Sequence, residues 1–290
     1  MREIKILAII VFFTGVLYWG VEPFAHTKLH PHVPAPDYTF KDADGLQGVK
    51  GDATKGAEIV SANCTACHSI KAVGFPPIMS DADNAASYGV VPPDLSTAGK
   101  LYNADYLAAF IKDPAKATKT SHKFEDGAMH PMPAYNWMQP QEIADVVAYL
   151  QSIAPKEMTN KEVYADACQR CHSIKYGDYY GGSMAAQTPD ADIKRYMGVV
   201  PPDLSQMIRS RGEHYLHEFI NDPQKHLAGT AMPRVGLTQE SEEQVIEYMT
   251  EVGDSKKPQR EALAGPFLGY LVIFAIFAWL WKAKIWRRVH

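Results

Sequence analysis

The chain carries the sequence Cys64-Thr65-Ala66-Cys67-His68 and, 104 positions later, Cys168-Gln169-Arg170-Cys171-His172, and these two motifs contain all four of its cysteines. The Cys-x-x-Cys-His pattern is typical of c-type haem attachment, because the two thiols add to the haem vinyl groups and the histidine can reach the iron. We therefore expect two covalently bound haem c groups. Cys64, Cys67, Cys168 and Cys171 would form the thioether bonds, and His68 and His172 would be axial iron ligands.

Three other interpretations of the cysteines agree less well with the sequence. A thioredoxin-like redox pair would require a βαβ setting, and the sequence pattern shows none. A four-cysteine zinc site usually has ~15–20 residues between its two Cys-x-x-Cys pairs, whereas the pairs here lie about a hundred residues apart. Disulfide bonds are common in exported chains, but they give no reason for a histidine directly after each pair. The haem interpretation accounts for both the spacing and the histidines.

The motifs belong to a longer internal repeat. Residues 89–96 recur identically at 198–205 as Gly-Val-Val-Pro-Pro-Asp-Leu-Ser, residues 106–114 match 215–223, and Met132-Pro133 matches Met232-Pro233. The offset between the copies changes from 104 to 109 to 100 residues, because loops absorb insertions. The chain is therefore expected to hold two copies of one module.

Each copy has the pattern of a few amphipathic helices joined by Pro- and Gly-rich loops. A first helix leads into the haem motif, and in copy two Thr159 and Glu162 form a capping box for it. A middle helix should end at Asp113-Pro114 in copy one and Asp222-Pro223 in copy two, and last helices should begin after Pro140 and near Thr238. We predict a mainly α fold with two tandem class I cytochrome c domains.

Apolar segments lie at both ends of the chain. Residues 262–281 are long enough to span a membrane, and residues 6–21 form either an uncleaved anchor, which we favour, or a signal peptide. The predicted organisation is an N-terminal transmembrane anchor (1–21), an extended linker (22–50), domain 1 (51–156), domain 2 (157–253), a linker (254–261), and a C-terminal transmembrane helix with a basic tail (262–290). His26, His30 and His32 of the first linker could bind a metal, but a solvated linker is favoured.

Charge predicts the orientation. Residues 1–21 carry +1 and residues 262–290 carry +4, which leaves −9 on the rest of a chain whose net charge is −4. The positive-inside rule places both termini in the cytoplasm and the haem domains in the periplasm of a bacterial inner membrane. The acidic exported part argues against nucleic-acid binding and suits either docking of basic redox proteins or plain solubility.

Each iron also needs a second axial ligand, which should come from the loop between the middle and last helices. Copy one offers Met129, His130, Met132 and Met138 in that loop, and copy two offers His226 and Met232. Only the Met-Pro pairs occupy equivalent places in both copies, so Met132 and Met232 are the predicted ligands, although a methionine can also simply fill a core.

The repeated Pro-Pro-Asp-Leu segment suggests residues around the haem. A ligating histidine usually donates its second ring N–H to a carbonyl, and we predict that the Pro93 carbonyl accepts from His68 and the Pro202 carbonyl from His172. The alternative is a rigid turn that packs on the haem. Arg209 and Arg211, which have no counterpart in copy one, could pair with haem propionates.

Residues 198–205, followed by Arg209-Ser-Arg211-Gly212 and Tyr215-Leu216, resemble the segment after the haem motif of cytochrome c1. A C-terminal membrane helix with a basic tail is also similar to that family. Cytochrome c1 ordinarily carries one haem and a cleaved signal, so this chain resembles the dihaem c1-type subunits of certain bacterial cytochrome bc1 complexes. The haem motifs themselves are specific for haem but not for this complex.

The resemblance implies an electron-transfer subunit of a quinol–cytochrome c oxidoreductase, not catalytic alone. Its implied partners are cytochrome b, a Rieske iron–sulfur protein as donor, and a cytochrome c or terminal oxidase as acceptor, in a dimeric complex. The main alternative is a dihaem subunit of a cbb3-type haem–copper oxidase, whose anchors are N-terminal. A dihaem enzyme such as a peroxidase and a membrane-tethered shuttle are further alternatives.

Overall fold

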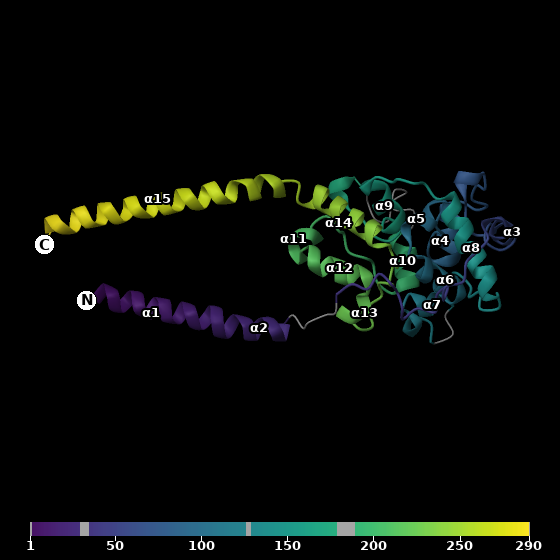
Figure 1. The fold of residues 1–290 in the computed structure, drawn as a ribbon, viewed down its shortest axis with the longest axis horizontal. Helices are drawn as coiled ribbons and strands as arrows, with labels where there is room; N and C mark the ends of the chain where they lie inside the picture. The colour runs from purple at the N-terminus through teal and green to yellow at the C-terminus, as the bar shows by residue number, and fades with distance from the viewer. Residues whose placement is uncertain (1, 30–34, 126–128, 179–188, 290) are drawn as a thin grey trace. The chain divides into compact units, whose positions relative to one another are not determined.

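The computed structural model describes residues 2–29, 35–125, 129–178 and 189–289 (Figure 1). Residues 1–36 and 37–290 form two compact units. The described residues are mainly helical and contain no named strand, only isolated bridges between Ile70 and Phe75 and between Tyr102 and Leu237. The prediction of a mainly α fold is confirmed.

The N-terminal unit contains one helical run, made of α1 (Arg2–Val16), a π-helical turn (Leu17–Val21) and α2 (Glu22–Leu29). The extended linker predicted from residue 22 is therefore wrong for Glu22–Leu29. Pro23 lacks an N–H and normally disrupts a helix. Here a wider π-helical turn precedes it, in which the Glu22 N–H donates to the carbonyl of Leu17, five residues earlier, and the helix continues through Pro23. His30 and His32 lie outside the described residues.

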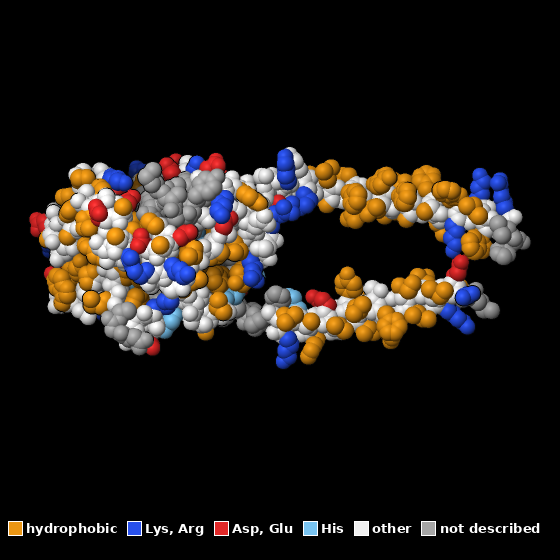
Figure 2. All heavy atoms as spheres, turned by 180° about the vertical axis from the view of Figure 1, so that it is seen from behind, with side chains coloured by type: hydrophobic (Ala, Val, Ile, Leu, Met, Phe, Trp, Pro, Cys, Tyr) orange, Lys and Arg blue, Asp and Glu red, His pale blue; other side chains and the backbone are white. Residues whose placement is uncertain are grey.

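The C-terminal helix α15 (Lys257–Val289) begins five residues before the predicted start at residue 262. Pro258 lies in the first turn of this helix, where the missing N–H costs nothing. Arg260 of the same helix forms a 2.7 Å ion pair with Asp254, which precedes the helix. This helix and the N-terminal run are both long and apolar enough to cross a membrane. Figure 2 shows hydrophobic side chains along each of them and basic side chains near each chain end.

Both copies of the repeat lie in the second unit, and their helices correspond. The predicted capping box at Thr159 and the predicted helix ends at Asp113 and Asp222 are confirmed. Each Asp-Pro pair also starts a further short helix, because Pro suits the first helical position. Copy one contains α3 (Ala53–Asn63), α4 (Asp81–Tyr88), α5 (Ala98–Leu101), α6 (Ala104–Lys112), α7 (Pro114–Ala117) and α8 (Pro140–Ile153), and copy two contains α9 (Asn160–Ala167), α10 (Asp190–Met197), α11 (Met207–Arg211), α12 (Glu213–Asn221), α13 (Pro223–His226) and α14 (Gln239–Gly253).

In each copy the first helix packs on the last, α3 on α8 and α9 on α14. The α3–α8 contact is close because Gly56 has no side chain: a Cβ there would lie 2.0 Å from the Asp145 backbone oxygen. Val60 of α3 and Val147 of α8 are among the most buried side chains of the core of copy one. Copy two has its own core around Val163, Tyr164 and Val245.

The two copies are joined directly. The Asn103 N–H donates to the Gly236 carbonyl and the Thr238 N–H to the Leu101 carbonyl, each at 2.9 Å. Leu101 of copy one is 1% exposed and belongs to the core of copy two, and Tyr102 packs against both cores. The copies therefore share hydrophobic packing rather than meeting at a polar linker.

Residues 37–46, here called the strap, cross both copies. Phe40 of the strap is 1% exposed and packs on Tyr106 of copy one. Asp42 receives two hydrogen bonds, of 2.8 and 2.9 Å, from Arg234 of copy two and pairs with Lys119 at 2.7 Å. Burial raises the pKa of Asp42, but the bonds from these two cations outweigh it and hold that pKa at about 2. This part of the predicted linker is therefore packed against the fold rather than a free tether.

Candidate haem cavity

The helix before each motif sets the position of the cysteines. α3 ends at Asn63, and the Cys64 N–H still donates to the Val60 carbonyl, while the His68 N–H donates to the Cys64 carbonyl, each at 2.9 Å. Copy two repeats this turn, with the His172 N–H donating to the Cys168 carbonyl at 2.9 Å. Each histidine is thus folded back over the first cysteine of its motif.

The predicted histidine hydrogen bonds are present in both copies. His68 Nδ1 lies 2.8 Å from the Pro93 carbonyl oxygen and His172 Nδ1 lies 2.9 Å from the Pro202 carbonyl oxygen. A carbonyl only accepts, so each Nδ1 carries the proton and each Nε2 keeps its lone pair for a metal. Burial lowers the pKa of His68 and of His172, which favours the neutral ring that can bind iron.

The aspartate after each of these prolines fixes the loop. Asp94 accepts hydrogen bonds from the Ser69 hydroxyl at 2.7 Å, the Ser96 N–H at 2.9 Å and the Lys71 N–H at 3.2 Å. Burial raises the pKa of Asp94, but these bonds outweigh it and lower that pKa below its usual value. Asp203 makes the same three bonds in copy two. Sequence reasoning missed this role, although the identical octapeptides contained the signal.

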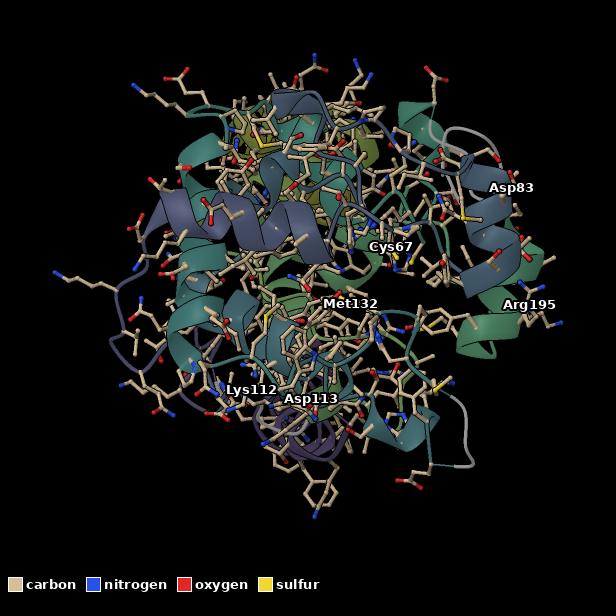
Figure 3. The ribbon with its side chains drawn as sticks, turned by 90° about the vertical axis from the view of Figure 1, so that its right-hand side faces the viewer. Cys67, Asp83, Lys112, Asp113, Met132 and Arg195 are labelled. Atoms are coloured by element: carbon tan, nitrogen blue, oxygen red, sulfur yellow. The ribbon has the colours of Figure 1, made fainter. Side chains whose placement is uncertain are left out.

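Residues of both motifs line one cavity. Its volume is about 380 Å³, within the range of ligand pockets, and mostly apolar side chains line it. Figure 3 shows two residues of its lining, Cys67 and Met132, near the centre of the fold. The structure brings together every predicted thioether and axial residue here: Cys64, Cys67, His68, Met132, Cys168, Cys171, His172 and Met232.

The other candidate axial ligands are partly separated from the cavity. Met129 is 88% exposed and does not line it, and neither does His226, which lies 3.3 Å from Glu218. His130 and Met138 do line the cavity beside Met132. The His130 ring is tied to the Met132 backbone by a 3.0 Å contact from Nδ1 to the carbonyl oxygen, and Met138 is 6% exposed within the core of copy one.

The structure does not support the prediction that Arg209 and Arg211 pair with haem propionates, because it places neither residue in the cavity lining. Both residues are exposed on α11 and are absent from the cavity lining. Helix α11 directs Arg211 over the Tyr215 ring, 5.4 Å from its centroid, and so away from the cavity. The arginines that do line the cavity are Arg170, inside the second motif, and Arg234, directly after Met232-Pro233.

The residues of the cavity fit haem c. All four cysteines are free thiols, and burial raises the pKa of Cys64 to about 11 and of Cys168 to about 12. Among the described residues no group of three or more His, Cys, Asp or Glu side chains is arranged to hold a metal ion. A flat apolar cofactor attached through two thiols and one imidazole per motif matches this donor set.

Comparisons with known proteins agree in part. No curated protein matches the chain. A solved structure titled "Hyperthermophilic respiratory Complex III" aligns with 98% of this chain and 99% of its own at 19% identity, but its TM-score of 0.32 is too low to support an argument. Residues 53–154 match the cytochrome c family. The chain therefore contains a cytochrome c domain at residues 53–154, which implies covalently bound haem c and a role in electron transfer.

Proposed function

We propose that both copies bind haem c and that the chain is a dihaem c1-type subunit of a bc1-type respiratory complex. The observation that carries the proposal is the equivalence of the two motifs. In each copy the histidine is hydrogen-bonded to a carbonyl of that copy's own Pro-Pro-Asp-Leu segment. Both motifs and both Met-Pro loops line one cavity. The cytochrome c match covers only the first copy, so the second haem is inferred from this repetition.

The haem iron supplies one-electron redox chemistry, and the protein supplies position and surroundings. The cysteines would hold each porphyrin. The Pro93 and Pro202 carbonyls orient the histidines, and the apolar lining would limit water around the cofactor. Because both motifs line one cavity, two haems bound there would be near neighbours. Electrons could then pass through the chain without a mobile carrier between its two copies.

The proposed donor is a Rieske iron–sulfur protein, and the proposed acceptor is a cytochrome c or terminal oxidase. Cytochrome b would be the membrane partner, in a dimeric complex as in the family that the sequence resembles. The two apolar terminal helices support membrane anchoring. The basic residues near both chain ends support an orientation with both termini in the cytoplasm and the haem domains in the periplasm.

The axial ligands Met132 and Met232 are tested by single substitutions to His. Ferric haem with a thioether ligand has a weak long-wavelength absorption band. If each Met binds one iron, Met132→His and Met232→His should each reduce this band by about half, because one of two such irons keeps its Met. Met138→Leu, which preserves the volume of a core methionine, is the matched control and should leave the band unchanged. A band that Met132→His does not reduce would exclude Met132 as a ligand.

The proposed complex is tested by extracting the tagged full-length protein in mild detergent and identifying the proteins that accompany it. Cytochrome b together with a Rieske protein would support the c1-type role. Haem–copper oxidase subunits alone would replace it with the alternative of an oxidase input subunit. Recovery of all of these would indicate a larger assembly in which this chain connects the two complexes.

A further inference from the structure

Arg170 is a cation at the boundary between the two copies. It lies in the second motif, between Cys168 and Cys171, and lines the cavity, where its side chain is half-buried. Its guanidinium donates to the Tyr102 hydroxyl of copy one at 3.5 Å, a distance too long for a strong hydrogen bond. Copy one has Ala66 at the equivalent position, so it provides no matching cation.

The guanidinium forms no salt bridge within the described part of the chain. Asp166 acts on it electrostatically, but the Asp166 carboxylate accepts its 2.7 Å hydrogen bond from the Thr97 hydroxyl instead. Arg234, the other arginine of the cavity, is in contrast neutralised by its two bonds to Asp42. Arginine stays charged at all accessible pH values, and a cation that is removed from water is usually paired with an anion. Arg170 thus provides an unused site for a carboxylate.

Haem chemistry indicates which carboxylate could reach Arg170. The two propionates of a haem project from the edge opposite its two vinyl groups. Arg170 lies between the cysteines that bind the vinyl edge of its own haem, so the propionates of that haem point away from it. The haem of the first motif is the remaining source. Two further observations place Arg170 beside copy one: its contact with the Tyr102 hydroxyl, and the cavity lining that it shares with Cys64, Cys67 and His68 of the first motif.

We propose that Arg170 binds a propionate carboxylate of the haem held by the first motif, across the boundary between the two copies. A guanidinium matches a carboxylate in charge and in its two-point geometry. Its positive charge also favours the reduced iron, which has one positive charge fewer than the oxidised iron, so it raises the reduction potential of the first haem. The inference rests on the proposed function, because it requires a haem in each copy.

The test uses the full-length chain with its haems, as Arg170→Gln and Arg170→Lys, with Arg209→Gln as a matched control because Arg209 is exposed and outside the cavity. Redox titration should show a lower potential for one haem in Arg170→Gln, by about a tenfold change in the reduction equilibrium, or ~59 mV for one electron. Arg170→Lys keeps the charge and should lose only part of this effect. The resonance Raman bending mode of the propionates should shift in Arg170→Gln but not in Arg209→Gln.

The affected haem is identified in a Met132→His background, in which the first haem has a lower potential and so becomes separable. A shift of that component supports the proposal. A shift confined to the other haem, or an unchanged potential and Raman mode in Arg170→Gln, would overturn it. The number of haems is measured first by intact mass. Two haems together with no effect of Arg170→Gln would refute only this inference. A single haem would refute the two-haem function and, with it, the proposed contact of Arg170 with the haem of the other copy.

Discussion

Substitution of Asp94 by alanine tests how the histidine of the first motif is held. Asp94 accepts hydrogen bonds from Ser69, Ser96 and Lys71, and it follows Pro93, whose carbonyl orients His68. Each net hydrogen bond contributes ~0.5–1.5 kcal/mol. Because Asp94 is only partly buried, we take the lower half of that range for three bonds and expect Asp94→Ala to lower the free energy of unfolding by about 2 kcal/mol.

The assay is guanidinium unfolding of the haem-loaded protein, followed by absorbance of the haem and by helical circular dichroism. Asp203→Ala removes the corresponding bonds in copy two and should cost a similar amount. Glu58→Ala, on the exposed face of α3, is the control and should change stability little. A loss for Asp94→Ala no larger than that of Glu58→Ala would refute the argument that this carboxylate fixes the loop.

Three further substitutions have expected outcomes. Gly56→Val should destabilise the fold by about 3 kcal/mol in thermal or denaturant unfolding, because the Cβ of the valine would lie 2.0 Å from the Asp145 backbone oxygen. An unchanged stability would contradict the close contact between α3 and α8. Tyr106→Phe should cost ~1–2 kcal/mol, because its hydroxyl donates to the buried Arg234 carbonyl, and a neutral result would mean that this bond contributes nothing. The pKa of Asp42 is lowered to about 2 in the fold, so the stability that Asp42 contributes is present above its unfolded pKa of ~4 and is lost as the pH falls toward 2. In denaturant titrations Asp42→Asn should therefore be less stable than wild type at pH 7 and equal to it near pH 2. A constant difference in stability across this pH range would refute the ion pair.

The features that sequence predicted well are local ones. The capping box at Thr159, the helix ends before Asp113-Pro114 and Asp222-Pro223, and the histidine-to-carbonyl bonds each depend on residues close in sequence or on a repeated segment. The repetition was useful because a residue with the same neighbours in both copies must satisfy the same physical requirement. For this reason the sequence alone predicts that the Pro93 and Pro202 carbonyls accept hydrogen bonds from the two histidines.

The features that sequence missed depend on tertiary packing. The linker predicted from residue 22 is helical over Glu22–Leu29 because a π-helical turn before Pro23 accommodates this proline. Residues 22–50 are predicted to be a tether because His26, His30 and His32 alternate with prolines, yet Asp42 of the strap binds Arg234, 192 residues away. The sequence suggests Arg209 and Arg211 for the haem propionates because they follow the repeated segment of copy two, and it gives no such reason to choose Arg170. Only the fold shows that Arg170 faces the cavity shared by both motifs.

The most direct test of the central claim is the intact mass of the protein purified from membranes, combined with a peptide map of its cysteines. The account predicts a chain heavier by two haems, with thioether bonds at Cys64 and Cys67 and at Cys168 and Cys171. Substitution of Cys168 and Cys171 by alanine should remove one haem and leave the other. A wild-type mass with one haem, or with unmodified Cys168 and Cys171, would contradict the claim that both copies are haem-binding modules.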